Sequence, residues 1–361
     1  MDRTDAIAWV VSFCASLRLS QAKTLSELSV AACSMNRASL AELGRCLARG
    51  AKVAVKHCIK RVDRFLGNAR IEPPEAMRGV IEWLARPRKR LIVILDWVDF
   101  RSFPCVLLAA RLKGRAVPLL WTVCRDGDLH RSRNNLEYGL LKVLRTMIPL
   151  STQVVVLADR GFGRAEMARE CQELKFDYVI RIRPDVYIRH EQYEGKLLDL
   201  PLREGFNCVY RQVQYRKSEP VEANVAVVWQ AGEPEAWFLL TSLPRLGGLK
   251  LTKVYAGRMS IEEYFRDAKS LRNGFALRLT LVKDPRRLER LLLVLAIAYL
   301  LLVAVGLYCR RRYRSGQWCA NNRDNECSLV SIGRFMLESF EGTWQGALAA
   351  LRREMVGGNW G

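Results

Sequence analysis

The stretch LIVILDWVDF, residues 91–100, decides the fold class of this chain. It is a near-continuous run of apolar and β-branched residues, which is typical of a strand buried on both faces. The run also contains Asp96, and a carboxylate in a buried strand costs free energy unless it is paired or bound to a metal ion. We therefore expect a central strand of an α/β sheet, with Asp96 as a candidate functional residue.

The next segments along the chain predict the rest of that sheet. CVLLAARL and VPLLWTVC, separated by a short turn, suggest that the first three strands form an antiparallel meander. Apolar residues then recur at helical spacing, and strands and helices alternate beyond them. The expected order is strand, strand, strand, helix, strand, helix, strand, at 91–100, 105–112, 117–124, 136–148, 154–162, 164–174 and 178–183.

Helices are expected before this sheet. Two capping boxes, Thr24-x-x-Glu27 and Ser39-x-x-Glu42, each precede apolar residues at helical spacing. A third helix near 51–66 ends at Gly67 and is rich in basic residues, namely Lys52, Lys56, Lys60, Arg61 and Arg64. Short helices with a basic last member suit a DNA-binding module, and a solvated basic face is the alternative.

The rest of the chain changes character twice. Residues 184–245 alternate polar and apolar side chains, which predicts short antiparallel strands in a β-rich insertion. From Leu249 the pattern returns to helix. Near the end, a polar loop with Asn321, Asn322 and Asn325 precedes a further helical segment.

Charge and cysteine usage narrow the function classes. The 361 residues include 58 Lys and Arg against 37 Asp and Glu, a net charge of +21. Such an excess favours a polyanionic partner, with nucleic acid ahead of an acidic membrane surface. Eleven cysteines without a CxxC pair and only three histidines argue against a disulfide scaffold and a zinc ribbon. A reducing cytoplasm fits better, and the first residues lack a secretory-signal pattern.

One run is long enough to be weighed as a membrane span. Residues 291–309 carry no charge and are flanked by arginines on both sides. Basic residues at both ends give no orientation under the positive-inside rule. A buried core helix is therefore the favoured interpretation, and a membrane anchor is the alternative.

Two acids in apolar strands predict a metal site. Asp96 lies within the first strand and Asp159 ends the fourth. A single such acid is usually a structural hydrogen-bond partner, whereas two on neighbouring strands more often bind a cation. Oxygen ligands without histidine or cysteine favour magnesium or manganese over zinc. Asp99, three residues after Asp96, points to the opposite face and is expected to be structural.

A third acid is expected from YAGRMSIEEYFRDAK. Its residues Tyr255, Arg258, Glu262 and Lys269 are spaced by 3, 4 and 7, which places all four on one narrow helical face. Glu262 is then a candidate metal ligand with phosphate-binding side chains beside it. The alternative is a surface stripe with ion pairs such as Glu262 with Arg266.

These residues resemble a known family. The spacing of Tyr255, Arg258, Glu262 and Lys269 is that of the Y-R-E-K signature of bacterial insertion-sequence transposases, family four, which includes the transposases of transposons Tn-ten and Tn-five. VDRFLGN, LDWVD, LADRGF and WFLLTSLP also look like family segments and occur in the same order, and IEEYFRDAKS is closest to the Tn-ten branch. The resemblance covers about residues 50–300.

The resemblance implies a DDE transposase with a ribonuclease-H-like mixed sheet core. Asp96, Asp159 and Glu262 would be catalytic and would bind two Mg2+ ions, with Mn2+ as a substitute. The implied organisation is a helical DNA-end-binding region at 1–88, the catalytic core in two parts at 89–183 and 246–309, the β-rich insertion at 184–245, and a C-terminal helical region at 310–361, with dimerisation as its candidate role.

The resemblance also implies DNA contacts and a reaction. The partners would be double-stranded terminal inverted repeats and target DNA, bound by a homodimer in the cytoplasm and without a membrane. Cutting would pass through a hairpin, with Trp237 stacking on a flipped base. The other expected DNA contacts are Tyr255, Arg258 and Lys269 near the cleaved end, and Lys56, Lys60, Arg61 and Arg64 on the basic helix.

Three alternatives stay open. The chain could be a repurposed DNA-binding protein, although all three acids are present. It could be a metal-dependent DNA nuclease on the same fold, without strand transfer. It could also be anchored in a membrane by residues 291–309.

Overall fold

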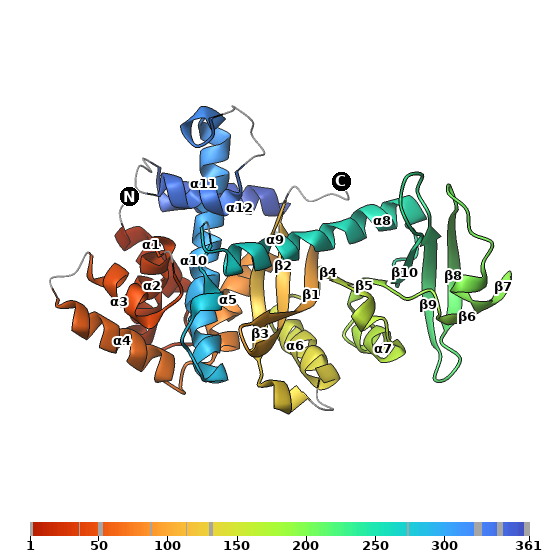
Figure 1. Cartoon of the computed structure of the whole chain (residues 1–361), viewed down its shortest axis with the longest axis horizontal. Coiled ribbons are helices and arrows are strands. Elements are labelled where there is room, and N and C mark those ends of the chain that lie inside the picture. The colour runs from red at the N-terminus through yellow and green to blue at the C-terminus, as the bar shows by residue number, and fades with distance from the viewer. Residues whose placement is uncertain are drawn as a thin grey trace.

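The fold is taken from a computed structural model, which describes residues 3–35, 37–49, 53–86, 89–112, 114–129, 133–272, 274–320, 327–337 and 342–356. The molecule is elongated, with the first helices at one end and the strands β6 to β9 at the other (Figure 1). Ala51, Lys52 and the expected polar loop at 321–326 lie outside the described residues.

A mixed sheet runs through most of the molecule. Its ten strands are arranged in the order β3-β2-β1-β4-β5-β10-β9-β8-β6-β7. The β1–β4 and β4–β5 pairs are parallel, and the other neighbours are antiparallel. The strands are β1 (Arg90–Phe100), β2 (Phe103–Leu112), β3 (Arg115–Val123), β4 (Gln153–Ala158), β5 (Asp177–Arg181), β6 (Tyr187–His190), β7 (Tyr193–Lys196), β8 (Asn207–Tyr215), β9 (Val221–Val228) and β10 (Trp237–Thr241).

The first half of the sheet confirms the predicted element order. The antiparallel meander β1 to β3 leads into α6 (Arg133–Met147), β4, α7 (Ala165–Glu173) and β5. Every residue of β2 but Arg111 is buried, as its apolar sequence predicts.

The β-rich stretch joins the same sheet. Its last strand, β10, pairs antiparallel with β5, with Leu240 opposite Ile180. The strands β6 to β9 then continue outward from β10. Short antiparallel strands are confirmed here, and they extend the core sheet instead of forming a separate one.

Helices form the N-terminal region, as expected. They are α1 (Arg3–Phe13), α2 (Leu19–Cys33), α3 (Leu40–Ala48), α4 (Val55–Gly67) and α5 (Pro73–Ala85). The Ser39 cap is confirmed, because its side chain accepts a hydrogen bond from the Glu42 amide at 3.2 Å. The Thr24 cap is wrong. α2 begins at Leu19, and the Thr24 hydroxyl donates to the carbonyl of Ser20 inside the helix.

The apolar run lies within α10 (Pro285–Arg312). This helix is long and apolar enough to cross a membrane by length and composition, yet 94% of its most apolar window is buried inside the fold. It packs against α2, α4, α5 and β3, and against α11 (Leu329–Met336) and α12 (Trp344–Val356). This burial supports the core-helix interpretation.

The signature segment forms two helices joined by a tight turn. α8 (Gly248–Ala256) passes through a 3-10 turn, η4 (Gly257–Met259), into α9 (Ser260–Lys269). α9 packs on β1, β2 and β3. Together α8 and α9 extend along the sheet from β8 and β9 to the meander (Figure 1).

Candidate active site

Asp96 and Asp159 lie where the parallel pairing between β1 and β4 stops, Asp96 within β1 and Asp159 just after β4. The last residues paired between β1 and β4 are Leu95 and Ala158, and each acid comes directly after one of them. Because the two strands run in the same direction, both acids lie on the same side of this last pair, and β1 continues past Asp96 to Phe100 in pairing with β2 alone. The Asp159 carboxylate accepts a hydrogen bond from the amide of Gly161 at 2.8 Å, in the 3-10 turn η2 (Arg160–Phe162).

Asp96 is the buried member of this pair. Burial raises its pKa to about 6 from an ordinary value of 3.8; the cation of Arg258 opposes this shift, and the negative charges of Asp159 and Glu262 add to it. Its carboxylate accepts hydrogen bonds from the Trp97 amide at 2.9 Å and from Arg258 Nη1 at 2.7 Å.

Arg258 lies between two of the acids. Its Nη2 is 3.7 Å from Oε1 of Glu262, and its Nη1 bonds Asp96. The helix α9 thus places Glu262 toward the strand ends that carry the two aspartates. The alternative of a Glu262–Arg266 surface pair is wrong, because Arg266 pairs with Glu263 at 3.1 Å.

Tyr255 and Trp237 extend this cluster along α8. Their rings meet edge to face with centroids 5.5 Å apart, and the guanidinium of Arg181 lies 5.2 Å from the centre of the Trp237 ring. Burial raises the pKa of Tyr255, and the cations of Arg258 and Arg181 oppose that shift. The phenol therefore stays protonated at neutral pH and can donate a hydrogen bond. Trp237, half-buried at the start of β10, belongs to the same side-chain cluster as the acids.

A comparison with protein families identifies the chain. The family model described as the transposase DDE domain matches residues 87–301, which include all three acids and the signature segment. The chain belongs to the DDE transposase family. No curated protein sequence matches it. The chain is therefore a transposase by its family. Transposases of this family bind DNA and use divalent metal ions.

The three acids of this DDE transposase are chemically suited to bind such an ion. Three carboxylates offer the hard oxygen ligands that magnesium and manganese prefer. Among the described residues, no three Asp, Glu, His or Cys side chains lie close enough to hold an ion as they stand. Asp96 and Glu262 instead share the positive charge of Arg258.

Lys269 completes the signature on α9. Burial lowers its pKa, and the nearby positive charge of Arg278 lowers it further, whereas the carboxylates of Asp99 and Glu262 oppose both effects. Arg258 thus bonds Asp96, the charge of Asp159 acts on Tyr255 and the charge of Glu262 acts on Lys269, although η4 interrupts the continuous helix that the spacing predicted.

The sequence did not single out three residues that surround Trp237. The exposed carboxylate of Glu235 pairs with Arg181 at 2.5 Å and with Arg160 at 3.4 Å. Arg160 directly follows Asp159 in LADRGF, so its position in the motif was an available signal. Arg181 ends a strand, where nothing in the sequence marks it as part of a site.

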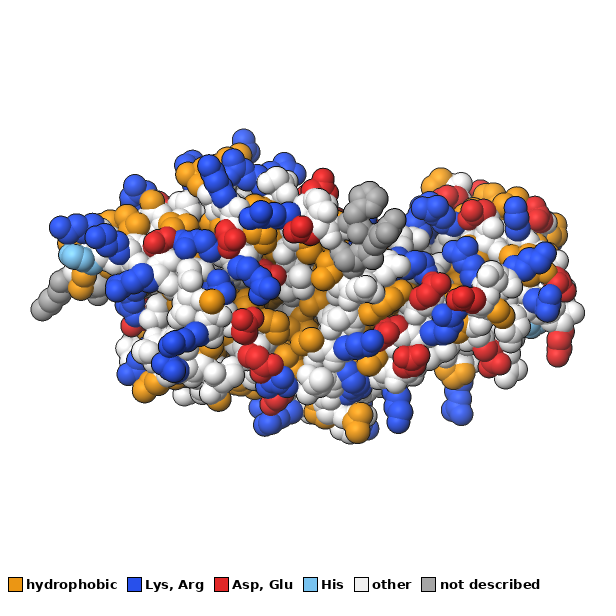
Figure 2. All heavy atoms as spheres, turned by 90° about the horizontal axis from the view of Figure 1, so that it is seen from below, with side chains coloured by type: hydrophobic (Ala, Val, Ile, Leu, Met, Phe, Trp, Pro, Cys, Tyr) orange, Lys and Arg blue, Asp and Glu red, His pale blue; other side chains and the backbone are white. Residues whose placement is uncertain are grey.

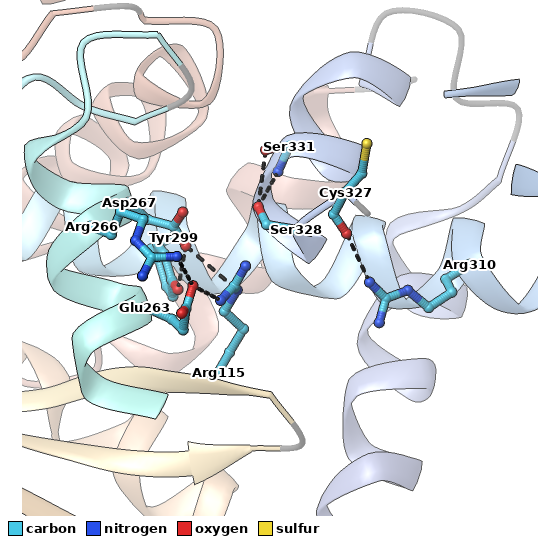
Figure 3. Close-up of polar contacts among 9 residues, drawn as sticks. All are labelled: Arg115, Glu263, Arg266, Asp267, Tyr299, Arg310, Cys327, Ser328 and Ser331. Carbon is cyan, nitrogen blue, oxygen red and sulfur yellow. Dashed lines mark hydrogen bonds and ion pairs between the residues drawn. The ribbon is translucent and has the colours of Figure 1, made fainter. Parts of the chain in front are cut away.

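The back of α9 is fixed by a second polar cluster (Figure 3). Arg115 of β3 bonds Glu263 at 2.9 Å and lies 3.6 Å from the buried Asp267, which accepts a hydrogen bond from Tyr299 of α10 at 3.0 Å. Because Glu263 and Asp267 project away from Glu262, these bonds anchor α9 to β3 and α10 while Glu262 faces the strand ends.

The expected DNA-binding residues of α4 differ in their surroundings. Lys56, Lys60 and Arg64 are exposed. Arg61 is half-buried, with Glu27 at 2.5 Å and the Thr24 hydroxyl at 3.1 Å, so it joins α4 to α2. Lysines and arginines are spread over the face seen in Figure 2, from the N-terminal helices to the outer strands, with acids between them.

Proposed function

We propose that this chain is a transposase of insertion-sequence family four, closest to the Tn-ten branch, that cuts at terminal inverted repeats and joins the ends to target DNA. One cluster carries the proposal: Asp96 and Asp159 lie just past the last residue pair of the parallel strands β1 and β4, and Arg258 links Asp96 to Glu262. The Y-R-E-K spacing in the same cluster supports the narrower family.

The core is proposed to be ribonuclease-H-like. An antiparallel meander followed by two parallel strands, in the order β3-β2-β1-β4-β5, supports this assignment. The strands after β5 would be the insertion that separates the second aspartate from the glutamate.

Asp96, Asp159 and Glu262 would hold two Mg2+ ions, or Mn2+ in their place. When bound, such ions lower the pKa of an attacking oxygen and stabilise the charge on a leaving one. The protein's part is to hold the scissile phosphate in line with the attacking oxygen. Arg258 would contribute by placing a fixed positive charge beside the phosphate as well as beside the acids.

The proposed chemistry has four steps at each transposon end. A water oxygen first bonds to phosphorus as the bond from phosphorus to the 3′-oxygen breaks. The water gives up a proton to solvent, and the departing 3′-oxygen takes up a proton from solvent to become a hydroxyl. The freed 3′-hydroxyl then attacks the opposite strand, so that one phosphodiester bond forms as another breaks and a hairpin results. Hairpin opening and strand transfer repeat this exchange with water and with target DNA.

Two further signature residues and Trp237 would position the DNA. The protonated phenol of Tyr255 and the ammonium of Lys269 would bond phosphates on either side of the acids. Trp237, beside Tyr255, would stack on a base flipped from the strained hairpin. We also propose that a homodimer pairs the two ends, and that the protein works in the cytoplasm.

The test uses purified protein, a labelled duplex carrying the element's inverted repeat, and a target plasmid. We expect Mg2+-dependent nicks at the repeat boundary, then hairpins, then joined products. Nicks without joining would make the protein a nuclease and overturn strand transfer. Binding without nicks in either Mg2+ or Mn2+ would overturn the enzymatic proposal.

A further inference from the structure

A buried glutamate contacts both the strand that carries Asp96 and, through Arg164, the turn that holds Asp159. Glu137 of α6 is 1% exposed. One of its carboxylate oxygens accepts a hydrogen bond from the Trp97 indole at 2.7 Å. Trp97 follows Asp96 on β1, so its side chain projects from the face of the sheet opposite to that of Asp96. The ring is covered by the guanidinium of Arg133, 4.5 Å from its centre.

The other oxygen of Glu137 leads to Asp159. It bonds Nη2 of Arg164, the residue that precedes α7. Nη1 of Arg164 donates to the Gly161 carbonyl at 2.8 Å, and the Gly161 amide donates to Asp159 at 2.8 Å. One carboxylate thus joins the residue next to Asp96 with the turn that holds Asp159.

This arrangement bears on how the two aspartates are spaced. Asp96 and Asp159 belong to strands joined by parallel pairing that ends one residue earlier, so strand pairing alone does not fix the position of Asp159. The Asp159 turn is instead held from behind. A charged pair away from water favours a narrow range of geometry, because leaving either partner unpaired is costly.

We infer that Glu137 is a positioning residue that sets the distance between Asp96 and Asp159 through Trp97 and Arg164. The inference rests on the proposed role of the two aspartates as metal ligands. Among the described residues, the hydrogen bonds of Glu137 go to Trp97 and Arg164 and not to the acids themselves. Its effect would reach them through the bonded groups, as side chains behind metal ligands do in other enzymes.

Glu137→Gln is the first test. The amide keeps an oxygen for the Trp97 indole but turns an N–H group toward Arg164, which releases the Asp159 turn. At saturating DNA we expect nicking to slow by about 10–100-fold and the Mg2+ needed for half-maximal nicking to rise by a similar factor. The affinity for end DNA should stay within about twofold. The rise in Tm that Mg2+ produces in the DNA-free protein should also require more Mg2+.

Trp97→Phe tests the other arm. It removes only the indole N–H donor and keeps an aromatic ring under Arg133. We expect a smaller defect than in Glu137→Gln, in the same direction for both nicking and Mg2+ dependence. Because this change leaves the Glu137–Arg164 pair intact, it reports on the inference even if Glu137→Gln folds poorly.

Glu170→Gln is the matched control. Glu170 of α7 is 9% exposed and pairs with Lys142 of α6 at 3.4 Å, so it also links α6 to α7. Within the described part of the chain, Lys142 is the one ion-pair partner of Glu170, and it lies on neither acid-bearing element. It should match the wild-type rate and Mg2+ dependence. Equal defects in Glu137→Gln and Glu170→Gln, or a Glu137→Gln protein with wild-type nicking and Mg2+ dependence, would overturn the inference.

The two proposals can fail separately. If the wild-type protein does not nick DNA, the proposed function fails. The inference then stands if Mg2+ raises the Tm of the wild-type protein and Glu137→Gln raises the Mg2+ required. It falls if Mg2+ stabilises both proteins alike or neither of them.

Discussion

Arg258 is the residue that connects the side chains of the candidate site. It contacts Asp96 and Glu262, and its charge acts on Tyr255 and Asp159 as well. A guanidinium held between acids lowers the repulsion between them, which favours the approach of Glu262 to Asp96. In the proposed reaction Arg258 faces a phosphate next to those acids. Its cation therefore pairs with negatively charged groups both in the free protein and in the complex with DNA.

The first prediction concerns the three acids. Asp96→Asn, Asp159→Asn and Glu262→Gln should each reduce nicking by roughly a thousandfold or more, because each removes a charged ligand from one site. Binding to end DNA should persist in a gel-shift assay. The control is Asp99→Asn on the same strand, which is exposed and should nick normally. Near-normal nicking by any of the three variants would remove that residue from the site.

The second prediction concerns pH and Asp96. Its pKa is about 6 in the folded protein against an ordinary 3.8, so ionised Asp96 opposes folding above pH 6. Asp96→Asn should therefore stabilise the metal-free protein at pH 8, by roughly 1–2 kcal/mol. The gain should shrink as the pH falls from about 6 toward 4, where wild-type Asp96 is protonated too. Urea unfolding of both proteins in EDTA measures this, and a gain that is constant with pH would contradict it.

The third prediction separates hairpin formation from nicking. Trp237→Ala should spare the first nick, which needs no flipped base, and slow hairpin formation. The loss of about 1–3 kcal/mol of stacking corresponds to roughly 5- to 150-fold in rate. A gel that resolves nicked and hairpin ends over time measures both steps. Trp237→Phe, which keeps a stacking ring beside Tyr255, is the control. Equal slowing of both steps with a lower Tm would make Trp237 a core residue instead.

At the scale of helices and strands, the sequence predicts those features that a local pattern of residues determines. The apolar strands and the alternating strands are recognisable because burial imposes a period on each. The start of α2 is not, because Thr24 and Glu27 satisfy the capping pattern inside a helix that begins at Leu19. The pairing of β10 with β5 joins distant segments, and no local pattern encodes such a contact.

The candidate site shows the same division. Spacing predicts that Tyr255, Arg258, Glu262 and Lys269 lie together, because four residues within one segment are constrained by helix geometry. Glu137 lies in NNLEYGLL, where nothing distinguishes it from an exposed helical acid. Its role depends on which strand ends α6 covers, and that is decided by the assembled sheet.

The fourth prediction concerns the contact between α10 and α11. A Cβ at Gly306 would lie 2.0 Å from the Leu329 carbonyl oxygen, and one at Gly333 would lie 2.1 Å from the Leu302 carbonyl oxygen. Gly306→Ala should therefore separate the helices and lower the free energy of unfolding by about 1–3 kcal/mol. Urea unfolding measures it. Gly139→Ala in α6 is the control, since an added Cβ meets nothing there and should stabilise by up to about 1 kcal/mol.

At the scale of the whole molecule, the fifth prediction concerns salt. The net charge of +21 should make end binding weaken steeply as salt rises. Reversing Lys56, Lys60 and Arg64 to Glu should reduce the slope of log affinity against log salt, by roughly one unit for each phosphate that is no longer bound. Arg312, Arg352 and Arg353, exposed in the C-terminal region, form the control triple. Equal slopes in both triples would mean that α4 is not the main DNA-binding element.

The packing of the first helices on α10 also means that these contacts form only after α10 has been synthesised. The Cys33 thiol of α2 donates to the Ala298 carbonyl, 265 positions later in the chain, and Arg290 bonds the carbonyls of Leu66 and Ile71. At about 5–20 residues per second, the ribosome needs roughly 15–50 s to cover that interval. During that time the parts of α2 and α4 that pack on α10 lack that partner. A newly made chain should therefore depend on chaperones until α10 emerges, and a fragment that ends before α10 should aggregate instead of binding DNA.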